Sequence, residues 1–320
     1  MKYPLVALAM LIASNCLGSV ADVEQAQTQQ TQQQQSTPQR PAPQQRRPDI
    51  PPDAAFYQDV SWSPDGRALA FTLLKDGAWD VYVMRDDGSR PLRLTNGTGL
   101  SSFYTSWSPY GRRIAFGAKR GRDAKTDIYV IDADGTNLRQ LTTDPAADST
   151  PAFSPDGRRI AFISDRDGLY QVYVMNADGS AQTRLTRDGA RDFNPQWSPD
   201  GRRIVYYAEK GDGKDQIWVV NADGSDPLLL TGGVGHNTSP AWSPDGRTII
   251  FSSRRDGAEK SYVYTMAADG SGVRRLTEQD GFYARFSPDG KRVAFATHGF
   301  PKNALYVMRS DGSDVKRLAP

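Results

Sequence analysis

Short runs of alternating apolar and polar residues, separated by turn signals, fill the chain from residue 53 to residue 320. In a typical stretch, residues 239–242 enter a Ser-Pro-Asp-Gly turn, and three further runs follow at residues 248–252, 261–266 and 273–277. Period-two alternation with β-branched and aromatic residues predicts strands. Sustained 3.6-residue apolar periodicity is missing, so we expect an all-β fold with four strands in each stretch.

Two kinds of turn recur at fixed intervals. The first is Ser-Pro-x-Gly, in which proline sets φ at the second position and glycine takes a positive φ. Its serines lie 44 to 46 residues apart, at Ser63, Ser108, Ser154, Ser198, Ser243 and Ser287. The second is Asp-Gly, a strong hairpin signal, between the third and fourth runs. Its aspartates are Asp87, Asp134, Asp178, Asp223, Asp269 and Asp311.

Six units of about 45 residues account for residues 53–320. One four-stranded sheet of this size cannot bury both its faces, and radial packing of repeated sheets solves the problem. An aromatic residue precedes each Ser-Pro-x-Gly turn and is expected to wedge between neighbouring sheets: Trp62, Trp107, Phe153, Trp197, Trp242 and Phe286. We therefore predict a six-bladed β-propeller of four-stranded antiparallel blades. How the ring closes stays open, because no strand is visibly borrowed across the seam.

The N-terminal segment carries the features of an export signal. Lys2 precedes an apolar stretch at residues 5–13 that is too short to span a bilayer, and small residues follow it. We predict a signal peptide at residues 1–21, cleaved after Ala21, and no integral membrane span. Lipid modification at Cys16 is the alternative, and either route exports the protein. Residues 22–52, rich in Gln and Pro, lack apolar periodicity and are predicted to be a disordered linker.

Composition limits the chemistry. Lys plus Arg (39) nearly balances Asp plus Glu (37), so nucleic acid is not an expected partner. Cys16 is the single cysteine, and His236 and His298 are the only histidines. These counts exclude a disulfide framework and a His-rich metal site and disfavour an enzyme. We expect no cofactor; a calcium or sodium ion in the channel would be compatible, but no residue can be assigned to it.

The repeat unit resembles the WD-like propeller repeat of the TolB family, the periplasmic component of the Tol-Pal envelope system. Residues 160–162 (Ile-Ala-Phe), 172–180 and 184–186 (Arg-Leu-Thr) form a complete example, and the resemblance covers residues 53–320. The family also has an α/β domain before the propeller, where this sequence has the Gln-rich linker. The resemblance implies a monomeric, non-enzymatic periplasmic scaffold that binds an envelope protein, such as a Pal-like lipoprotein.

One local match points to candidate contacts. The segment from His236 to Gly246 resembles a TolB blade that reads H-N-x-x-P-x-F-S-P-D-G, although it lies in the fifth unit here rather than an early one. In the family this histidine belongs to the surface that meets the lipoprotein Pal. The resemblance therefore implies that His236 and Ser239 contact a partner, and Asn237 is a candidate because it lies on the same rim.

Strand order places the loops that enter each inner strand on one rim, together with the loops between the second and third strands. Aromatic residues with polar neighbours on that rim suit a protein-binding patch. This reasoning adds Tyr104, Asp192, Phe193 and Tyr283 to the candidate contacts. The alternative is that the aromatic side chains fill the central funnel. The opposite rim, with its repeated turns, is expected to be structural.

An enzyme is the alternative function. Some propeller hydrolases and lyases hold a metal or an acid pair at the channel mouth, where Asp59, Asp148, Asp192 and His236 would have to converge. Asp132-Ala133-Asp134-Gly135 invites a calcium interpretation, but its surroundings lack the further oxygen ligands of a calcium loop. We therefore expect a hairpin turn at that segment.

Overall fold

The computed structural model describes residues 56–209, 214–255, 257–297 and 303–318. The predicted signal peptide, the predicted linker and Cys16 lie outside these residues. All described residues belong to one unit, residues 51–320.

Six antiparallel sheets of four strands each make up this unit, and each sheet takes its strands in chain order. We number the sheets as blades 1 to 6. Their strands are β1 (Phe56–Trp62), β2 (Ala68–Lys75), β3 (Ala78–Arg85), β4 (Leu92–Arg93); β5 (Leu100–Trp107), β6 (Arg113–Arg120), β7 (Asp127–Asp132), β8 (Arg139–Gln140); β9 (Asp148–Phe153), β10 (Arg159–Ser164), β11 (Gln171–Asn176), β12 (Thr183–Arg184); β13 (Arg191–Trp197), β14 (Arg203–Glu209), β15 (Asp215–Asn221), β16 (Leu228–Leu229); β17 (Asn237–Trp242), β18 (Thr248–Ser253), β19 (Tyr262–Ala267), β20 (Arg274–Arg275); and β21 (Phe282–Phe286), β22 (Arg292–Ala296), β23 (Leu305–Arg309), β24 (Lys316–Arg317).

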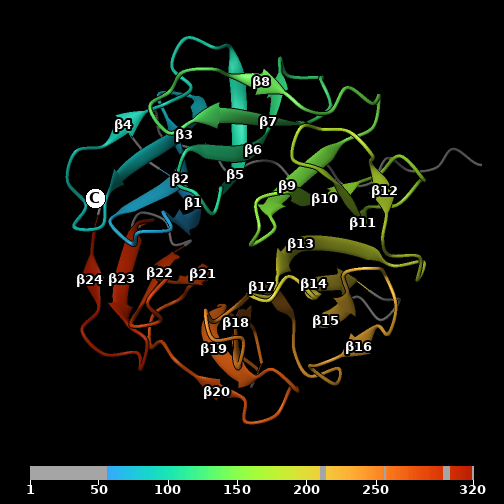
Figure 1. The fold of residues 1–320 in the computed structure, drawn as a ribbon. Helices are drawn as coiled ribbons and strands as arrows, with labels where there is room; N and C mark the ends of the chain where they lie inside the picture. The colour runs from blue at the N-terminus through green and yellow to red at the C-terminus, as the bar shows by residue number, and fades with distance from the viewer. Residues whose placement is uncertain (1–55, 210–213, 256, 298–302, 319–320) are drawn as a thin grey trace, which may run out of the picture. The chain divides into compact units, whose positions relative to one another are not determined.

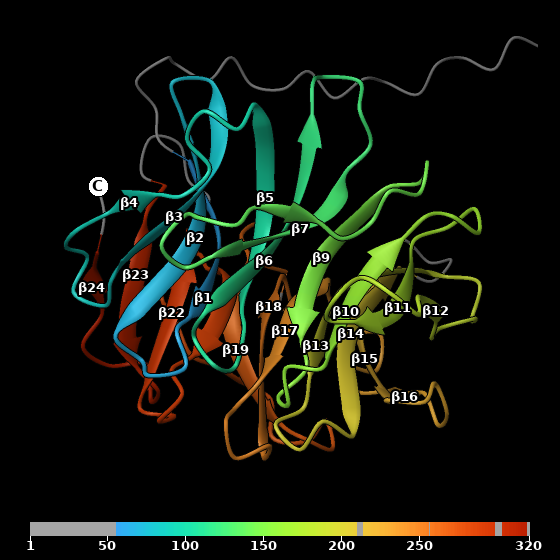
Figure 2. The same ribbon diagram turned by 45° about the horizontal axis from the view of Figure 1, so that its top comes forward.

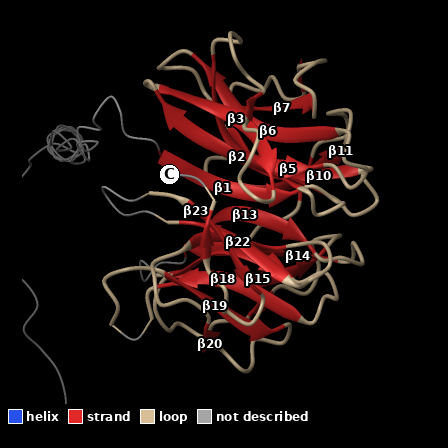
Figure 3. Cartoon of the chain, turned by 90° about the vertical axis from the view of Figure 1, so that its left-hand side faces the viewer, coloured by secondary structure: helices blue, strands red, loops and turns tan. Residues whose placement is uncertain are grey.

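The blades stand in a ring around a common axis (Figure 1). The first strand of each blade lies nearest the axis, and the fourth, only two residues long, lies at the periphery. The described part of the chain contains strands and loops without a helix (Figure 3). The all-β class and the six-bladed propeller of four-stranded antiparallel blades are confirmed.

Both kinds of turn form as predicted. In each Ser-Pro-x-Gly turn the glycine N–H donates to the serine carbonyl at 2.8 to 2.9 Å, and the glycine has φ between +66° and +71°. The Asp-Gly turns close hairpins between the third and fourth strands, and Asp132–Gly135 is one of them, between β7 and β8.

Each blade interface contains one apolar cluster, and six clusters account for six interfaces. The aromatic residue before the Ser-Pro-x-Gly turn packs in each case against the preceding blade. Trp197 of blade 4, for example, shares a cluster with Ala161 and Val172 of blade 3. The predicted wedge role is therefore confirmed. Burying each ring stabilises the fold by roughly 3 kcal/mol.

The seam between blades 6 and 1 is built like the other interfaces and needs no shared strand. Trp62 packs on Ala294 and Val307 of blade 6, and its indole N–H donates to the Arg285 carbonyl at 3.1 Å. The Tyr57 N–H donates to Asn303 Oδ1 at 2.8 Å across the same joint. Side-chain packing and these hydrogen bonds close the ring.

Every inner strand contains a β-bulge at the same place. The register with the second strand shifts in all six blades, four residues before the turn serine. The bulged residues all have left-handed backbone, with φ between +47° and +57°: Asp59, Tyr104, Thr150, Asn194, Ser239 and Tyr283. A bulge interrupts the period-two alternation of side chains. It therefore decides which inner-strand residues turn toward the axis.

Candidate functional site

The rim at which the inner strands begin, here the entry rim, also carries the loops between second and third strands, such as the one that joins β2 to β3 (Figure 2). The opposite rim, with the Ser-Pro-x-Gly and Asp-Gly turns, is the turn rim. The seven predicted contact residues lie on the inner strands β5, β13, β17 and β21 or directly before them. The structure separates them into buried and accessible side chains.

Asp192 and Asn237 occupy equivalent positions, and both are buried in blade-to-blade contacts. The Asp192 carboxylate accepts a hydrogen bond from Thr186 Oγ1 in the preceding blade. The Asn237 amide donates to Gln216 Oε1 of the preceding blade at 3.2 Å and accepts from Ser253 Oγ at 2.7 Å. Ser239, a bulge residue, is 3% exposed. The Asp192 and Asn237 side chains therefore join neighbouring blades, and none of the three side chains is presented on the surface.

Asp148 occupies the equivalent position in blade 3, and its charged partner, Arg166, lies in the same blade after β10. Both oxygens of the Asp148 carboxylate accept hydrogen bonds from Arg166 Nη2, at 3.0 and 3.1 Å, and Asp148 is fully buried. Burial raises the pKa of Asp148, against the opposing effect of the Ser164 hydroxyl and the Arg166 charge. The residue six positions before the turn serine is therefore a structural anchor in blades 3, 4 and 5.

Five aromatic side chains on or near the inner strands form two groups of ring contacts. The Phe193 ring lies 5.7 Å from the Tyr170 ring and 5.1 Å from the Tyr207 ring, centroid to centroid. Tyr104 and Tyr283, from blades 2 and 6, meet edge to face at 6.1 Å. Burial raises the pKa of Tyr207, and the Tyr283 phenol acts in the same direction. We call Tyr104, Tyr170, Phe193, Tyr207 and Tyr283 the aromatic set; all five are partly accessible.

Ionisable side chains form a row across the entry end of blade 4. Arg191 Nη1 lies 4.0 Å from Glu209 Oε2, and Glu209 is paired in the sheet with Asp215. His236 Nδ1 lies 3.4 Å from Asp215 Oδ2. Burial raises the pKa of Asp215, and the His236 interactions oppose that shift. The His236 side chain is 44% exposed, so it is accessible to a partner.

Two residues of opposite charge lie on the inner strands of blades 1 and 6: Asp59 on β1, which is buried, and Arg285 on β21, which is half-buried. Asp59 accepts hydrogen bonds from Thr72 Oγ1 at 2.6 Å and from Thr105 Oγ1 at 2.8 Å. Burial raises the pKa of Asp59 to about 6, and the Thr105 backbone and the Arg285 charge oppose the rise. Burial also lowers the pKa of Arg285 to about 10, and Asp59 opposes that shift. The hydrogen bond from Thr105 to Asp59 links blades 1 and 2 near the axis.

The acids considered for an enzyme have separate partners. Asp59 contacts Thr72 and Thr105, whereas Asp148 pairs with Arg166. Among the described residues, no group of three or more His, Cys, Asp or Glu side chains is placed to hold a metal ion. Within the same residues, no helix has the length and apolar character needed to cross a membrane.

The sequence did not single out four residues that the structure adds: Tyr170 and Tyr207 beside Phe193, Asp215 beside His236, and Arg285 on β21. Tyr170 and Tyr207 lie outside the inner strands, so their sequence positions resemble those of ordinary blade residues. Tyr170 directly precedes β11 and Tyr207 lies within β14, so their aromatic identity was the one available signal.

Comparison with known proteins gives a consistent result. Residues 105–212 and 193–320 match the model of the TolB beta propeller domain. The Tol-Pal system protein TolB of Anaeromyxobacter dehalogenans is 39% identical over 95 residues, which are 29% of this chain and 20% of that protein. A solved structure described as a putative TolB from Agrobacterium tumefaciens is 27% identical, covers 79% of this chain and 90% of its own, and has a TM-score of 0.64.

A solved oligogalacturonate lyase in complex with manganese is similar in fold. It is 16% identical, covers 83% of this chain and 77% of its own, and has a TM-score of 0.59. At that identity the likeness concerns the fold alone. The matches to the curated relatives span 20% to 34% of those proteins' lengths.

Proposed function

This chain belongs to the TolB β-propeller domain family, and from that premise we propose that it is an exported, non-enzymatic scaffold in the periplasm. Its entry rim would bind a protein of the envelope, such as a Pal-like lipoprotein, in a Tol-Pal type role. The curated relatives named Tol-Pal system protein TolB support this reading.

The observation that carries the proposal is that aromatic and ionisable side chains lie close together on β13 and β14, at the entry end of blade 4. Phe193 contacts Tyr170 and is paired in the sheet with Tyr207, two residues from the paired Arg191 and Glu209. In the ionisable row, the Arg191 side chain is 59% exposed and the His236 side chain is 44% exposed. Large, rigid aromatic groups flanked by charged groups are typical of the residues that dominate protein–protein binding. We place the contact on blades 4 and 5, with Phe193 and His236 at its centre.

The experiment measures binding of the purified mature protein to a purified Pal-like lipoprotein by titration calorimetry. Phe193→Ala combined with His236→Ala should weaken binding by about thirtyfold or more, as expected for loss of a binding hot spot. Phe103→Ala is the matched control, because Phe103 occupies the equivalent position in blade 2 and packs against Trp79. The control should retain binding within about twofold.

Unchanged binding by the folded double variant would overturn the site. Asn237→Ala is not a useful contact variant, since its loss would disturb the blade interface. An enzyme, either a hydrolase or a lyase, is the alternative function. Its discriminating measurement is metal analysis of the purified protein, in which a stoichiometric transition metal would favour it.

A further inference from the structure

One Ser-Pro-x-Gly turn differs chemically from the other five. In those five, an aspartate Oδ1 accepts a hydrogen bond from the serine hydroxyl at 2.5 to 2.6 Å. The same oxygen accepts the backbone N–H two residues later, at 3.0 to 3.1 Å. These hydrogen bonds lower the pKa of each carboxyl group, so the turns favour a carboxylate at this place: Asp65, Asp156, Asp200, Asp245 and Asp289.

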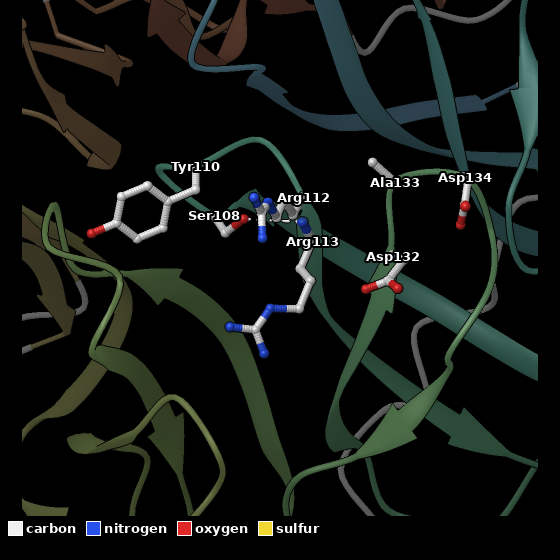
Figure 4. A pocket seen from close by; sticks show the side chains of 7 residues that line it. All are labelled: Ser108, Tyr110, Arg112, Arg113, Asp132, Ala133 and Asp134. Carbon is white, nitrogen blue, oxygen red and sulfur yellow. Dashed lines mark hydrogen bonds between the residues drawn. The ribbon is translucent and has the colours of Figure 1, made fainter.

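Blade 2 has Tyr110 at this position, and its ring does not replace the carboxylate. Tyr110 is 71% exposed, and its hydroxyl donates to the Asp156 carbonyl of blade 3 at 3.1 Å. The ring points away from Arg112 and Arg113 (Figure 4). The place that the carboxylate oxygen takes in the other turns is therefore left to solvent.

Two donors that face this place are unused. Ser108 is 3% exposed, and its oxygen accepts the Arg113 N–H at 3.0 Å. Among the described residues, nothing accepts the Ser108 hydroxyl hydrogen or the Arg112 backbone N–H. A buried donor without an acceptor is costly, so an external acceptor would be bound favourably.

Two arginines stand beside these donors. The equivalents of Arg113 in blades 3, 4 and 6 lie over a tryptophan of the next blade, with Arg159 over Trp197 at 4.5 Å as one case. The Arg113 guanidinium has no hydrogen bond, ion pair or ring contact with any residue that the structure describes. Instead it lines a hollow of about 940 Å³ with Ser108, Tyr110 and Arg112 (Figure 4).

We propose that this hollow on the turn rim binds a carboxylate group supplied from outside the blade. The carboxylate takes the position of the missing aspartate side chain and accepts from Ser108 Oγ and the Arg112 N–H. The Arg112 and Arg113 guanidinium groups supply the charge, since they match carboxylate geometry. This site lies on the rim opposite the proposed partner surface and does not depend on it.

The other wall of the hollow limits the choice of anion. Asp132 and Asp134 line it, and their carboxylates accept hydrogen bonds from Asn137 Nδ2 at 2.7 Å and from Thr136 Oγ1 at 2.7 Å. Their negative charges repel a dianion more strongly than a single carboxylate. The site is therefore expected to prefer acetate over inorganic phosphate. An acidic side chain of a polypeptide and a small free carboxylate share the required chemistry.

The experiment follows backbone amide signals of the ¹⁵N-labelled protein by NMR while sodium acetate replaces sodium chloride at constant ionic strength. The NMR signal of the Arg112 amide should shift until the site is saturated. The dissociation constant should be on the order of 10 mM, as expected for a few charge-assisted hydrogen bonds in water. The Arg202 amide is the internal control, because Asp200 already occupies its acceptor position. The Arg202 amide signal should shift by less than about a fifth as much as the Arg112 signal, because its N–H already has an acceptor and cannot bind acetate.

Two variants make the result specific. Tyr110→Asp supplies the carboxylate from within the turn and should abolish the saturable shift. Tyr110→Phe keeps the ring but loses the bond to Asp156 and should retain the shift. An Arg112 amide that moves no more than Arg202, persistence of the shift in Tyr110→Asp, or tighter binding of phosphate than of acetate would each overturn the proposal.

A terminally blocked Gly-Asp-Gly peptide distinguishes the two sources. Binding at least tenfold tighter than acetate would support an acidic side chain of a polypeptide, because neighbouring peptide groups add contacts. Equal affinity would support a small free carboxylate.

Discussion

The Arg292 guanidinium lies over the Trp62 ring, 4.8 Å from its centroid, and these residues come from the last and the first blade. Arg203 and Trp242 make the same contact at 4.9 Å between blades 4 and 5. The seam therefore uses the contact that joins consecutive blades inside the ring. It adds an ion pair, because Arg292 Nη1 also lies 2.8 Å from Asp86 Oδ2.

This relationship predicts that Arg292→Ala lowers the free energy of unfolding by about 1–3 kcal/mol. The substitution removes the ring contact, the partly exposed ion pair and a hydrogen bond from Arg292 Nη2 to the Gly66 carbonyl at 3.0 Å. Arg203→Ala, the matched variant, loses only the ring contact and should cost about 0.5–1 kcal/mol. Urea unfolding followed by circular dichroism measures both values. Equal losses would mean that the polar contacts of Arg292 with Asp86 and Gly66 add nothing to the seam.

Glycine at the Asp-Gly turn of blade 1 should be required for closure. A Cβ added at Gly88 would lie 2.4 Å from the Leu318 carbonyl oxygen of blade 6, and Gly88 has φ +87°. Gly88→Ala is expected to cost about 3 kcal/mol or more, from the backbone conformation and the steric conflict together.

Gly77→Ala is the control for this substitution. Gly77 has φ +77°, but an added Cβ meets nothing within 4 Å. The substitution should cost about 1–2 kcal/mol, the backbone contribution alone. Thermal and urea unfolding of both variants test the difference. Identical losses would show that blade 6 can move away from Gly88 without cost.

The Asp59 carboxyl group should make stability depend on pH. Its pKa is about 6 in the folded protein, above the ordinary value of 3.8, because burial disfavours the charged form. The folded state therefore holds this proton more tightly than the unfolded state. The contribution to stability is full below about pH 4 and is lost as the pH rises through 6.

Asp59→Asn removes this dependence. Relative to the unsubstituted protein, the variant should gain up to about 3 kcal/mol between pH 4 and pH 7.5, which is the energy of a shift of about two pKa units. Urea unfolding at both pH values gives the difference. A variant that keeps a constant offset from the unsubstituted protein at both pH values would contradict the assignment.

Arg166 should matter far more than a surface arginine or lysine. Its removal leaves the Asp148 carboxylate buried without its charged partner, since the Asp148 side chain is 0% exposed. Arg166→Ala is therefore expected to cost about 3–5 kcal/mol.

Lys125→Ala provides the comparison on the same rim. Lys125 Nζ lies 3.2 Å from Asp165 Oδ2, but its side chain is 59% exposed, so the loss should stay below about 1 kcal/mol. Chemical unfolding measures the loss of unfolding free energy in both variants. Similar costs for the two variants would mean that the Asp148 anchor is not important for blade packing.

The repeat made the architecture predictable because its signals are local. The turn residues act within four positions, and their spacing of 44 to 46 residues counts the blades. The aromatic wedge before each turn was equally readable, since a fixed position in every unit must meet an equivalent neighbour. Trp62 and Trp197 confirm this with clusters that include the preceding blade.

The candidate site was only partly predictable. His236 and Phe193 are accessible as expected. Their sequence neighbours, Asn237 after His236 and Asp192 before Phe193, are buried. Strand alternation would suggest opposite sides for such neighbours, but it does not say which side meets the next blade. Tyr207 joins the site from a second strand, and nothing near it in the sequence connects it with Phe193.

The sequence by itself determined the number of blades, the turns and the wedge residues, because each depends on contacts within a unit or on a feature that every unit repeats. Only the tertiary structure decided which polar inner-strand residues anchor the blades and which face solvent. The physical reason is the bulge at Asp59 and its five equivalents, where a left-handed residue other than glycine reorients the strand. Packing of neighbouring blades imposes that conformation, and no local sequence preference marks it.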